Sequence, residues 1–317
     1  MAAATTTASI VHAAVPQIST LIVAVLIGAV IGNGQPSVDV LRPGLAAAAR
    51  RLLRIGVVLL GLRLSIEQIT SLGFATVSLV VVTVATTFVG TRWLGSRLGL
   101  SPALSLLVAT GYSICGASAI AAMEGTSDAD EDEVALAIGL VTLAGTAAMF
   151  SLPTLASVLG LSDHQFGLWV GASVHDVAQV VAAASTGGSA VLAIAIVVKL
   201  TRVVMLAPLV AGVSIARKRR VNGDPNHGPA ATAPLLPLFV LGFLSLMAAR
   251  STGAVPDAVI SLANTLANLS LTAALVGLGA GVRFDRLRNL GLRPLALGGL
   301  AWVVVASVSL IGALIVG

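Results

Sequence analysis

The sequence consists of long apolar runs separated by short stretches rich in charge, glycine and proline. Most runs approach the ~20 residues that a helix needs to cross the hydrocarbon core of a bilayer. They are too long for the strands of a membrane barrel, and they do not alternate between polar and apolar residues. The pattern therefore predicts an all-α polytopic membrane protein with about ten hydrophobic segments. These are Val15–Ile31, Leu52–Ile66, Leu72–Gly95, Leu104–Met123, Val134–Leu159, Phe166–Ala184, Val191–Ala216, Leu235–Ala249, Val259–Val282 and Leu295–Val316.

Composition agrees with this pattern. Of the 317 residues, 57% are hydrophobic and only 10% are charged, whereas soluble domains carry roughly a quarter charged residues. We therefore expect a single transmembrane domain over residues 1–317, with the 14 N-terminal residues and a cytoplasmic loop at 217–233 outside the membrane. The single cysteine, Cys115, excludes an internal disulfide framework. No basic residue precedes the first apolar run, which argues against a cleaved signal peptide.

Basic residues gather in alternate loops, namely between the first two runs, after the third, after the seventh, and between the last two. The positive-inside rule places all these loops in the cytoplasm, so we expect both termini to face outward. The formal net charge of +5 then reflects topology. We expect no nucleic-acid binding, because no aromatic or groove-reading motif accompanies the clusters. The residues are Arg42, Arg50, Arg51, Arg54, Arg92, Arg97, Arg217, Lys218, Arg219, Arg220, Arg283, Arg286, Arg288 and Arg293.

The first three runs resemble the last three at a constant offset of 218 residues. Leu64–Gly73 matches Val282–Gly291, and Pro16 aligns with Pro234. An odd number of membrane crossings separates each run of the first set from its counterpart in the last set. The two repeats would therefore have opposite orientations in the membrane. Inverted repeats are typical of secondary transporters.

A second similarity relates two Gly-Ala-Ser triplets inside apolar runs, Gly116–Ser118 and Gly171–Ser173. If all ten runs cross the bilayer, these two runs point the same way, the inversion is broken, and the acidic run Asp128–Glu133 lies outside. If both segments are broken or re-entrant helices that enter from opposite faces, the inversion is restored and the acidic run is cytoplasmic. The basic clusters are compatible with both arrangements, so the sequence leaves both open.

Polar groups at membrane depth are the best pointers to function. The first group is Gly111–Ser118, in which glycines weaken the helix and Ser113 and Ser118 offer hydroxyls. A helix break here frees backbone groups, which is tolerated only where they are buried in protein or line a cavity. An opened helix N-terminus also favours anions. The alternative is close helix packing through small residues.

Two further groups of polar residues follow Gly111–Ser118 along the chain. Gln179 is four residues from His175 and three from Asp176, so it shares a helix face with each. A histidine and a carboxylate at mid-membrane can hold and release a proton; alternatively, they neutralise a nearby cation and satisfy a buried carbonyl. Lys199 and Arg202 lie three apart on the next run, and two cations against one carboxylate leave a positive surplus that suits an anion. The alternative is one salt bridge plus one cation that reaches the headgroups.

Other polar residues predict structure more than chemistry. Arg63 and Glu67, four residues apart, predict an ion pair at the membrane edge. Asn264 and Asn268 predict hydrogen bonds between helices. The sequence has no zinc-protease, nucleophile-elbow or phosphate-loop motif. We therefore expect no enzymatic activity, no cofactor and no metal.

Four stretches are similar to the YeiH family of bacterial inner-membrane proteins, whose members are often labelled sulfate exporters: Leu53–Leu64, Ser113–Ala119, Gly171–Ala183 and Lys199–Pro208. The resemblance covers nearly the whole chain, although an extra N-terminal span of some relatives has no counterpart. Asp176 stands where relatives often carry glutamate, which keeps the charge. The resemblance implies a multi-pass protein of the inner membrane, related to the superfamily of cation/proton antiporters and anion transporters. That superfamily uses inverted repeats with broken, crossing helices, and a core domain that often moves against a scaffold.

Together these features predict a secondary transporter of a small anion, such as a sulfate-like oxyanion or an organic acid. The substrate would bind where the two Gly-Ala-Ser segments meet, and His175 and Asp176 would couple its movement to protons, sodium being the other coupling ion left open. The alternatives are a cation/proton antiporter of the same fold and a membrane sensor or scaffold that does not transport. The sequence leaves open whether the protein forms a homodimer. The predicted substrate-binding residues are Ser113, Cys115, Gly116, Ser118, Gly171, Ser173, Gln179, Lys199 and Arg202.

Overall fold

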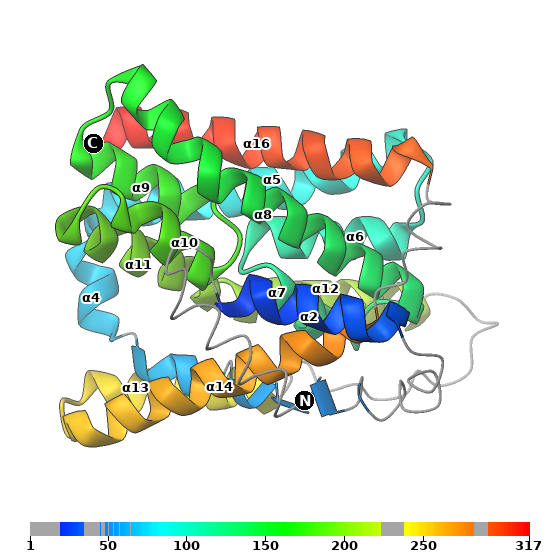
Figure 1. Ribbon diagram of the computed structural model, residues 1–317, viewed down its shortest axis with the longest axis horizontal. Helices are drawn as coiled ribbons and strands as arrows, with labels where there is room; N and C mark the ends of the chain where they lie inside the picture. Colours follow the sequence, from blue (N-terminus) through cyan, green and yellow to red (C-terminus); the bar gives the residue numbers. More distant parts are fainter. Residues whose placement is uncertain are drawn as a thin grey trace.

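The structure of the protein is a computed structural model (Figure 1). It describes residues 20–34, 65–222, 238–281 and 291–317, together with residues 45, 48, 49, 51, 52, 54–56 and 58–63. All regular elements in that part of the chain are helices, which confirms the predicted all-α class. They are α2 (Thr20–Gly34), η1 (Gly61–Arg63), α4 (Ile66–Ser71), α5 (Gly73–Arg97), α6 (Pro102–Ser113), α7 (Ala117–Glu124), α8 (Glu131–Leu159), α9 (Asp163–Ser173), α10 (Val177–Ser185), α11 (Ser189–Val204), α12 (Leu206–Asn222), α13 (Leu238–Ser251), α14 (Asp257–Gly281) and α16 (Leu292–Val316).

Several helices are suited to a bilayer. Within the described residues, four stretches are long and apolar enough to cross one: Gly73–Arg97, Asp132–Leu159, Ser189–Arg217 and Leu292–Val316. The third stretch comprises α11 and α12, which have only Met205 between them. Large apolar side chains such as Phe74 and Phe150 are exposed, as expected where lipid is the solvent. The protein is therefore a membrane protein with transmembrane helices. The 14 N-terminal residues and most of the predicted loop at 217–233 lie outside the described residues.

α5 and α16 pack against each other in antiparallel orientation, along the longest direction of the molecule (Figure 1). The Arg293 guanidinium at the start of α16 lies beside Gly99, just past the end of α5. At the other end of the pair, Leu79 near the start of α5 lies against Gly312 near the end of α16. The two helices therefore span the same thickness in opposite directions.

The end of the molecule where α5 finishes carries arginines from several predicted cytoplasmic loops. We call it the basic end, defined by Arg92, Arg97, Arg217 and Arg293. Arg92 and Arg217 line one cavity there, and this end lies opposite the chain terminus marked C in Figure 1. Among the other arginines of the first and last predicted clusters, Arg42, Arg50, Arg283, Arg286 and Arg288 lie outside the described residues.

The acidic run also lies at the basic end. Asp128 forms an ion pair with Arg217, whose guanidinium also donates to the backbone oxygen of Thr126 at 3.1 Å. Ser101, at the start of α6, donates to the carboxylate of Glu133 in the first turn of α8. α8 begins with a capping box, in which the carboxylate of Asp130 accepts from the backbone of Glu133. The acidic run and Arg217 therefore share one side of the molecule, as expected for the broken or re-entrant arrangement.

α2, α13 and α14 lie together on the opposite face of the molecule from α16 (Figure 1). α2 and α14 approach so closely that a Cβ on Gly28 would lie 2.1 Å from the backbone oxygen of Val276. A Cβ on Gly32 would lie 2.2 Å from the oxygen of Ala280. Because both residue numbers rise together along this contact, the two helices are parallel, and only glycine permits their approach.

The polar residues of this layer confirm one prediction from the sequence and contradict another. Arg63 donates to the side-chain oxygens of Asn264 at 2.7 Å and Asn268 at 2.8 Å. The predicted hydrogen bonds of the two asparagines to another helix are therefore confirmed. The predicted ion pair between Arg63 and Glu67 is wrong. The reason is that α4, which carries Glu67, begins only after the turn at η1, so the two side chains do not share one continuous helix.

Candidate functional site

The first Gly-Ala-Ser segment is a broken helix. α6 ends at Ser113, and α7 starts at Ala117. The turn between them depends on Gly116, whose φ of 72° and ψ of −134° are rarely adopted by residues with a side chain. The Gly116 backbone N–H donates to Gly111 at 3.0 Å, which closes the end of α6. The chain therefore stops and restarts as a helix within three residues, deep inside the protein.

The second segment is broken as well. α9 ends at Ser173, and α10 starts at Val177. Val174 is extended, with φ −66° and ψ 143°, so the chain leaves the helical path at once. The side-chain oxygen of Gln179 accepts from the backbone N–H of Asp176 at 3.2 Å, which fixes the start of α10. His175 and Asp176 therefore lie in the break itself, and not on a continuous helix face with Gln179.

Each broken segment returns to the end of the molecule from which it came. The hydrogen bond between Ser101 and Glu133 holds the start of α6 beside the start of α8. Both ends of the α6–α7 unit therefore lie at the basic end. α9 runs parallel to α11, since Gly167 lies against Val191 and Ile194, and Gly171 further along α9 packs further along α11.

α10 therefore doubles back, and a Cβ on Gly187, just beyond it, would lie 3.0 Å from the ring of Phe166 near the start of α9. The α9–α10 unit thus opens toward the opposite end from the α6–α7 unit. The two breaks meet inside, where a Cβ on Gly116 would lie 3.6 Å from the backbone oxygen of His175. We call this meeting point the crossing, defined by residues 113–118, 171–179 and 199–202.

The two Gly-Ala-Ser triplets are not equivalent in this arrangement. Gly116–Ser118 follows its break and begins α7, whereas Gly171–Ser173 precedes its break and ends α9. The equivalent positions are instead 60 residues apart and pair Ile114 with Val174. The two glycines have different roles. Gly116 permits the turn, whereas Gly171 permits a close helix contact, since a Cβ there would lie 2.6 Å from the backbone oxygen of Ala195.

Lys199 of α11 lies between the two breaks. Its ammonium donates to the backbone oxygen of Ile114 at 2.6 Å and to that of Val174 at 2.9 Å. The side chain is fully buried. One cation thus bonds equivalent carbonyl groups at the ends of α6 and α9.

Arg202, one turn further along α11, completes this arrangement. Its guanidinium donates to the backbone oxygens of Ser113 at 2.9 Å, Tyr112 at 2.9 Å and Val174 at 3.1 Å. A weaker contact reaches Gly171 at 3.4 Å. The last carbonyl groups of a helix have no partner within the helix and form the negative end of its dipole. Arg202 therefore stabilises the C-terminal ends of both α6 and α9.

Both cations lie at the crossing, as the sequence predicts, but their donors face backbone oxygens. The alternative in which one cation reaches toward the headgroups does not fit Arg202, which is fully buried. Two of the predicted hydroxyls also bond to their own helices: Ser173 donates to Trp169 at 2.6 Å, and Ser113 donates to Thr110 at 3.2 Å. In this conformation, the side chains of Lys199, Arg202, Ser113 and Ser173 therefore bond to backbone oxygens at or near the crossing and stabilise it.

The N-terminal ends of α7 and α10 differ from each other. α7 has no acidic residue in its first turn, and Gly116 supplies no side-chain cap. Ser118 donates to the backbone oxygen of Cys115 at 3.1 Å, and the Cys115 sulfur lies 2.8 Å from the Ser118 hydroxyl. α10 instead begins directly after the carboxylate of Asp176. The start of α7 is therefore a positive helix end with no acidic residue in its own cap or first turn, while α10 begins directly after a carboxylate.

His175 is buried beside these ends, with 1% of its surface exposed. Neither of its ring nitrogens has a hydrogen-bond partner in the part of the chain that the structure describes. Its ring packs edge-on against Tyr112, with centroids 4.5 Å apart. A buried imidazole with two free nitrogens can accept a proton or bind a ligand. Gln179, the last predicted residue here, donates to the backbone oxygen of Thr142 at 3.5 Å.

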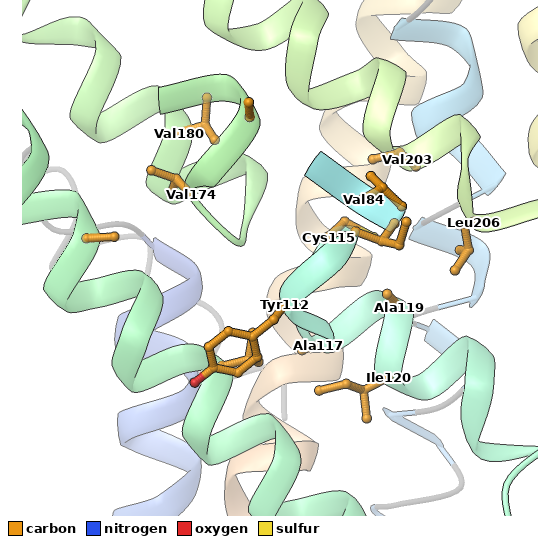
Figure 2. Packing of buried hydrophobic residues seen from close by; sticks show 14 of the residues in the cluster. Val84, Tyr112, Cys115, Ala117, Ala119, Ile120, Val174, Val180, Val203 and Leu206 are labelled. Atoms are coloured by element: carbon orange, nitrogen blue, oxygen red, sulfur yellow. The ribbon is translucent and has the colours of Figure 1, made fainter. Parts of the chain in front are cut away.

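Apolar residues enclose the breaks (Figure 2). Figure 2 shows Cys115 and Ala117 at the first break near Val84 of α5 and Val203 of α11, and Val174 at the second. This shell excludes water from the bonds that Lys199 and Arg202 make, and so strengthens them. The structure thus brings all eleven predicted residues of the substrate and proton sites to one place.

Two features were missed from the sequence. Tyr112 supports the His175 ring and gives a carbonyl to Arg202; the only signal was that it is the single tyrosine of the chain and adjoins Gly111. The second is a cavity of about 1070 Å³ at the basic end. It is lined by residues that include Phe88, Arg92, Ser101, Leu106, Asp128 and Arg217, which come from four separate stretches of sequence.

Comparisons with known proteins agree with this description. The family model described as Conserved hypothetical protein 698 matches residues 1–298. The chain is 41% identical to a UPF0324 membrane protein of Corynebacterium glutamicum, over 94% of this chain and 86% of the relative. It is 37% identical to a UPF0324 membrane protein of Pseudomonas putida, over 90% of this chain and 83% of the relative. For one from Pasteurella multocida the identity is 32%, over 91% and 86%. No solved structure matches the chain.

Proposed function

The chain belongs to the family described as Conserved hypothetical protein 698, the YeiH family, and we propose that it is a secondary transporter of a small anion. The anion would be a sulfate-like oxyanion or an organic acid. The protein would act in the bacterial cell membrane, where two broken helices crossing at mid-depth form the transport site.

The observation that carries this proposal is the pairing of Lys199 and Arg202 with the C-terminal carbonyls of α6 and α9. At a crossing of broken helices, negative C-terminal ends and positive N-terminal ends meet in a low-dielectric interior. The two buried cations offset the negative ends. The N-terminus of α7 has no acidic residue in its own first turn, and a positive helix end of this kind would favour an anion.

The proposal gives roles to the predicted residues at the two helix starts. The groups at the start of α7 that would bind the anion are the backbone that follows Gly116 and the hydroxyl of Ser118, which would turn from its bond to the Cys115 oxygen. Asp176, at the start of α10, would repel an anion while it is ionised. Protonation of Asp176 or of His175 would remove that repulsion, and this couples anion binding to uptake of a proton.

The fold supports a topology of ten hydrophobic segments, two of which re-enter. We propose that α6–α7 enters from the cytoplasm and α9–α10 from outside, so that every basic loop is cytoplasmic and both termini face outward. α5 and α16 support the inverted repeat, since the offset of 218 superposes their boundaries within one residue. Adding 218 to the number of Gly28 gives residue 246, and subtracting 218 from that of Val276 gives residue 58. These two positions lie in neighbouring elements that contact each other through Gly61 and Gly242. The contact of Gly28 with Val276 therefore has a counterpart at the same offset.

Coupling to protons is tested by flux into proteoliposomes that contain a pH-sensitive dye, with sulfate, phosphate, chloride and acetate as trial anions. We expect anion uptake to acidify the lumen stoichiometrically beyond the signal of protein-free liposomes, and Asp176→Asn and His175→Ala to change the pH dependence of uptake. His164→Ala is the matched control, since His164 is exposed near the start of α9. Normal transport with an unchanged pH profile in both crossing variants would refute their coupling role.

A cation/proton antiporter of the same fold is the second candidate, and Asp176 favours it. An intramembrane carboxylate in a helix break can bind a cation and a proton in turn. The variant Lys199→Ala does not separate the two candidates, because Lys199 holds both breaks together in either case. The transported ion separates them: the antiporter predicts dye signals driven by sodium or potassium gradients and unaffected by the choice of anion.

A further inference from the structure

One face of α5 carries three buried hydroxyls in a line. Thr83, Thr87 and Thr91 follow one another at intervals of four residues, so they lie one above the other on one side of the helix. Their exposed fractions are 1%, 0% and 0%. None of the three hydroxyls has a hydrogen-bond partner in the part of the chain that the structure describes.

Three other buried helical threonines behave differently. Thr110, Thr201 and Thr272 donate to the backbone oxygen four residues earlier, at 2.8, 2.9 and 2.7 Å. The same bond is available within any helix by rotation about χ1. Among the described residues, the hydroxyls on α5 do not make this bond, and they carry the desolvation cost of buried polar groups without a bond in return. Such a cost is explained if another state of the protein hydrates these groups.

The line continues onto α6. A fourth buried hydroxyl without a partner among the described residues belongs to Ser105. It lies opposite Gly95, where a Cβ would be 2.2 Å from the Ser105 oxygen. Gly95 is four residues beyond Thr91, so the four hydroxyls occupy successive turns of α5. They cover about 18 Å, because a helix rises ~1.5 Å per residue.

Both ends of this line lead to features already described. Ser105 lies in the first turns of α6, between Ser101 and Leu106, which line the cavity at the basic end. At the other end, Figure 2 draws Val84, the residue that follows Thr83, beside Cys115 at the first break, and both belong to one cluster of buried residues. The buried hydroxyls of α5 and Ser105 therefore extend from the cavity at the basic end toward the depth of the crossing.

We propose that Thr83, Thr87, Thr91 and Ser105 form the polar wall of an access route between the cavity at the basic end and the crossing. The route is shut in this structure and hydrated when the anion enters or leaves. This inference rests on the proposed function, since it gives the path to the proposed site. Hydroxyl groups suit a small hydrated anion because they donate hydrogen bonds without a fixed charge that would trap it.

The test is water access, measured without any substrate. Thr83→Cys, Thr87→Cys and Thr91→Cys are each made in a Cys115→Ala background and reconstituted in vesicles of both orientations. The probe is a charged, membrane-impermeant methanethiosulfonate, which reacts with the thiolate and therefore requires water at the thiol. Thr272→Cys serves as a buried control whose native hydroxyl is bonded, and Thr86→Cys as a control on the exposed face of α5.

We expect the three variants to react at least tenfold faster than Thr272→Cys, and only when the reagent is applied to the basic end. Reaction no faster than Thr272→Cys would overturn the route. Size-exclusion chromatography confirms that each variant is folded. The isosteric variant Thr87→Val provides a second measurement. Its anion flux should be at least threefold slower than that of the wild type, and an unchanged flux contradicts the proposal.

The two proposals fail in different ways. If the three cysteine variants on α5 are labelled but the protein moves no anion, the access route is supported and the transport function is refuted. Anion flux without labelling and without an effect of Thr87→Val would refute the route alone.

Discussion

The backbone carbonyl groups of Ile114 and Val174, 60 residues apart in sequence, point at the same ammonium group. That group belongs to Lys199, which donates to them at 2.6 and 2.9 Å. The two carbonyls occupy equivalent positions in two broken helices that open toward opposite ends of the molecule. A single buried side chain therefore joins both halves of the proposed transport site.

The first prediction concerns this ammonium group. Lys199→Met keeps much of the side-chain length but removes the donor to the Ile114 carbonyl and one of the two donors to the Val174 carbonyl. A buried carbonyl left without its donor costs about 1–3 kcal/mol. We expect a clear fall in the unfolding temperature of the detergent-solubilised protein, followed by tryptophan fluorescence. Arg217→Gln is the control, because Arg217 is largely exposed and pairs at the surface, where such pairs contribute ~1 kcal/mol or less. Equal unfolding temperatures for the two variants would contradict the role of Lys199.

The turn at the first break gives a second prediction. Gly116→Ala places a side chain at φ 72° and ψ −134°, and such strained backbone costs on the order of 1–3 kcal/mol. There is space for the methyl group, so the backbone conformation alone causes the loss.

Gly139→Ala is the matched control for that variant. Gly139 lies inside α8 with nothing within 4 Å of an added Cβ, and alanine favours a helix interior over glycine by ~0.5–1 kcal/mol. We therefore expect Gly116→Ala to unfold at a lower temperature than wild type, and Gly139→Ala at the same or a higher one. The reverse order would show that Gly116 is not needed for its conformation.

The third prediction tests re-entry of α6–α7. Ser127→Cys, made in a Cys115→Ala background, should react with an impermeant maleimide only from the cytoplasmic side, because Thr126 and Asp128 on either side of it contact Arg217 at the basic end. Ser162→Cys at the start of α9 should react only from outside. Labelling of Ser127→Cys from outside would mean that α6–α7 crosses the membrane fully.

Some of the site could be read from the sequence because ionisable residues are rare in apolar runs. The pair His175 and Asp176 stands out there, and the second break occurs at it. The partners of Lys199 and Arg202 could not be predicted, because backbone carbonyls carry no sequence signal and become acceptors only where a helix ends.

Register was the other feature that the sequence did not determine. The two Gly-Ala-Ser triplets look equivalent, yet small residues permit a sharp turn at Gly116 and a close helix contact at Gly171. The ion pair of Asp128 with Arg217 joins residues 89 apart, and only the return of α6–α7 to its starting end brings them together.

The most direct test of anion transport is the charge moved when ions are exchanged rapidly over proteoliposomes on a solid-supported membrane. Jumps in sulfate, phosphate, chloride and acetate are compared with jumps in sodium and potassium. Wild type is measured beside Asp176→Asn and the control Asp257→Asn, an exposed carboxylate in the first turn of α14. We expect transient currents from at least one anion, lost or altered in pH dependence in Asp176→Asn and kept in Asp257→Asn. Currents driven by sodium or potassium alone, with none from any anion, would contradict anion transport.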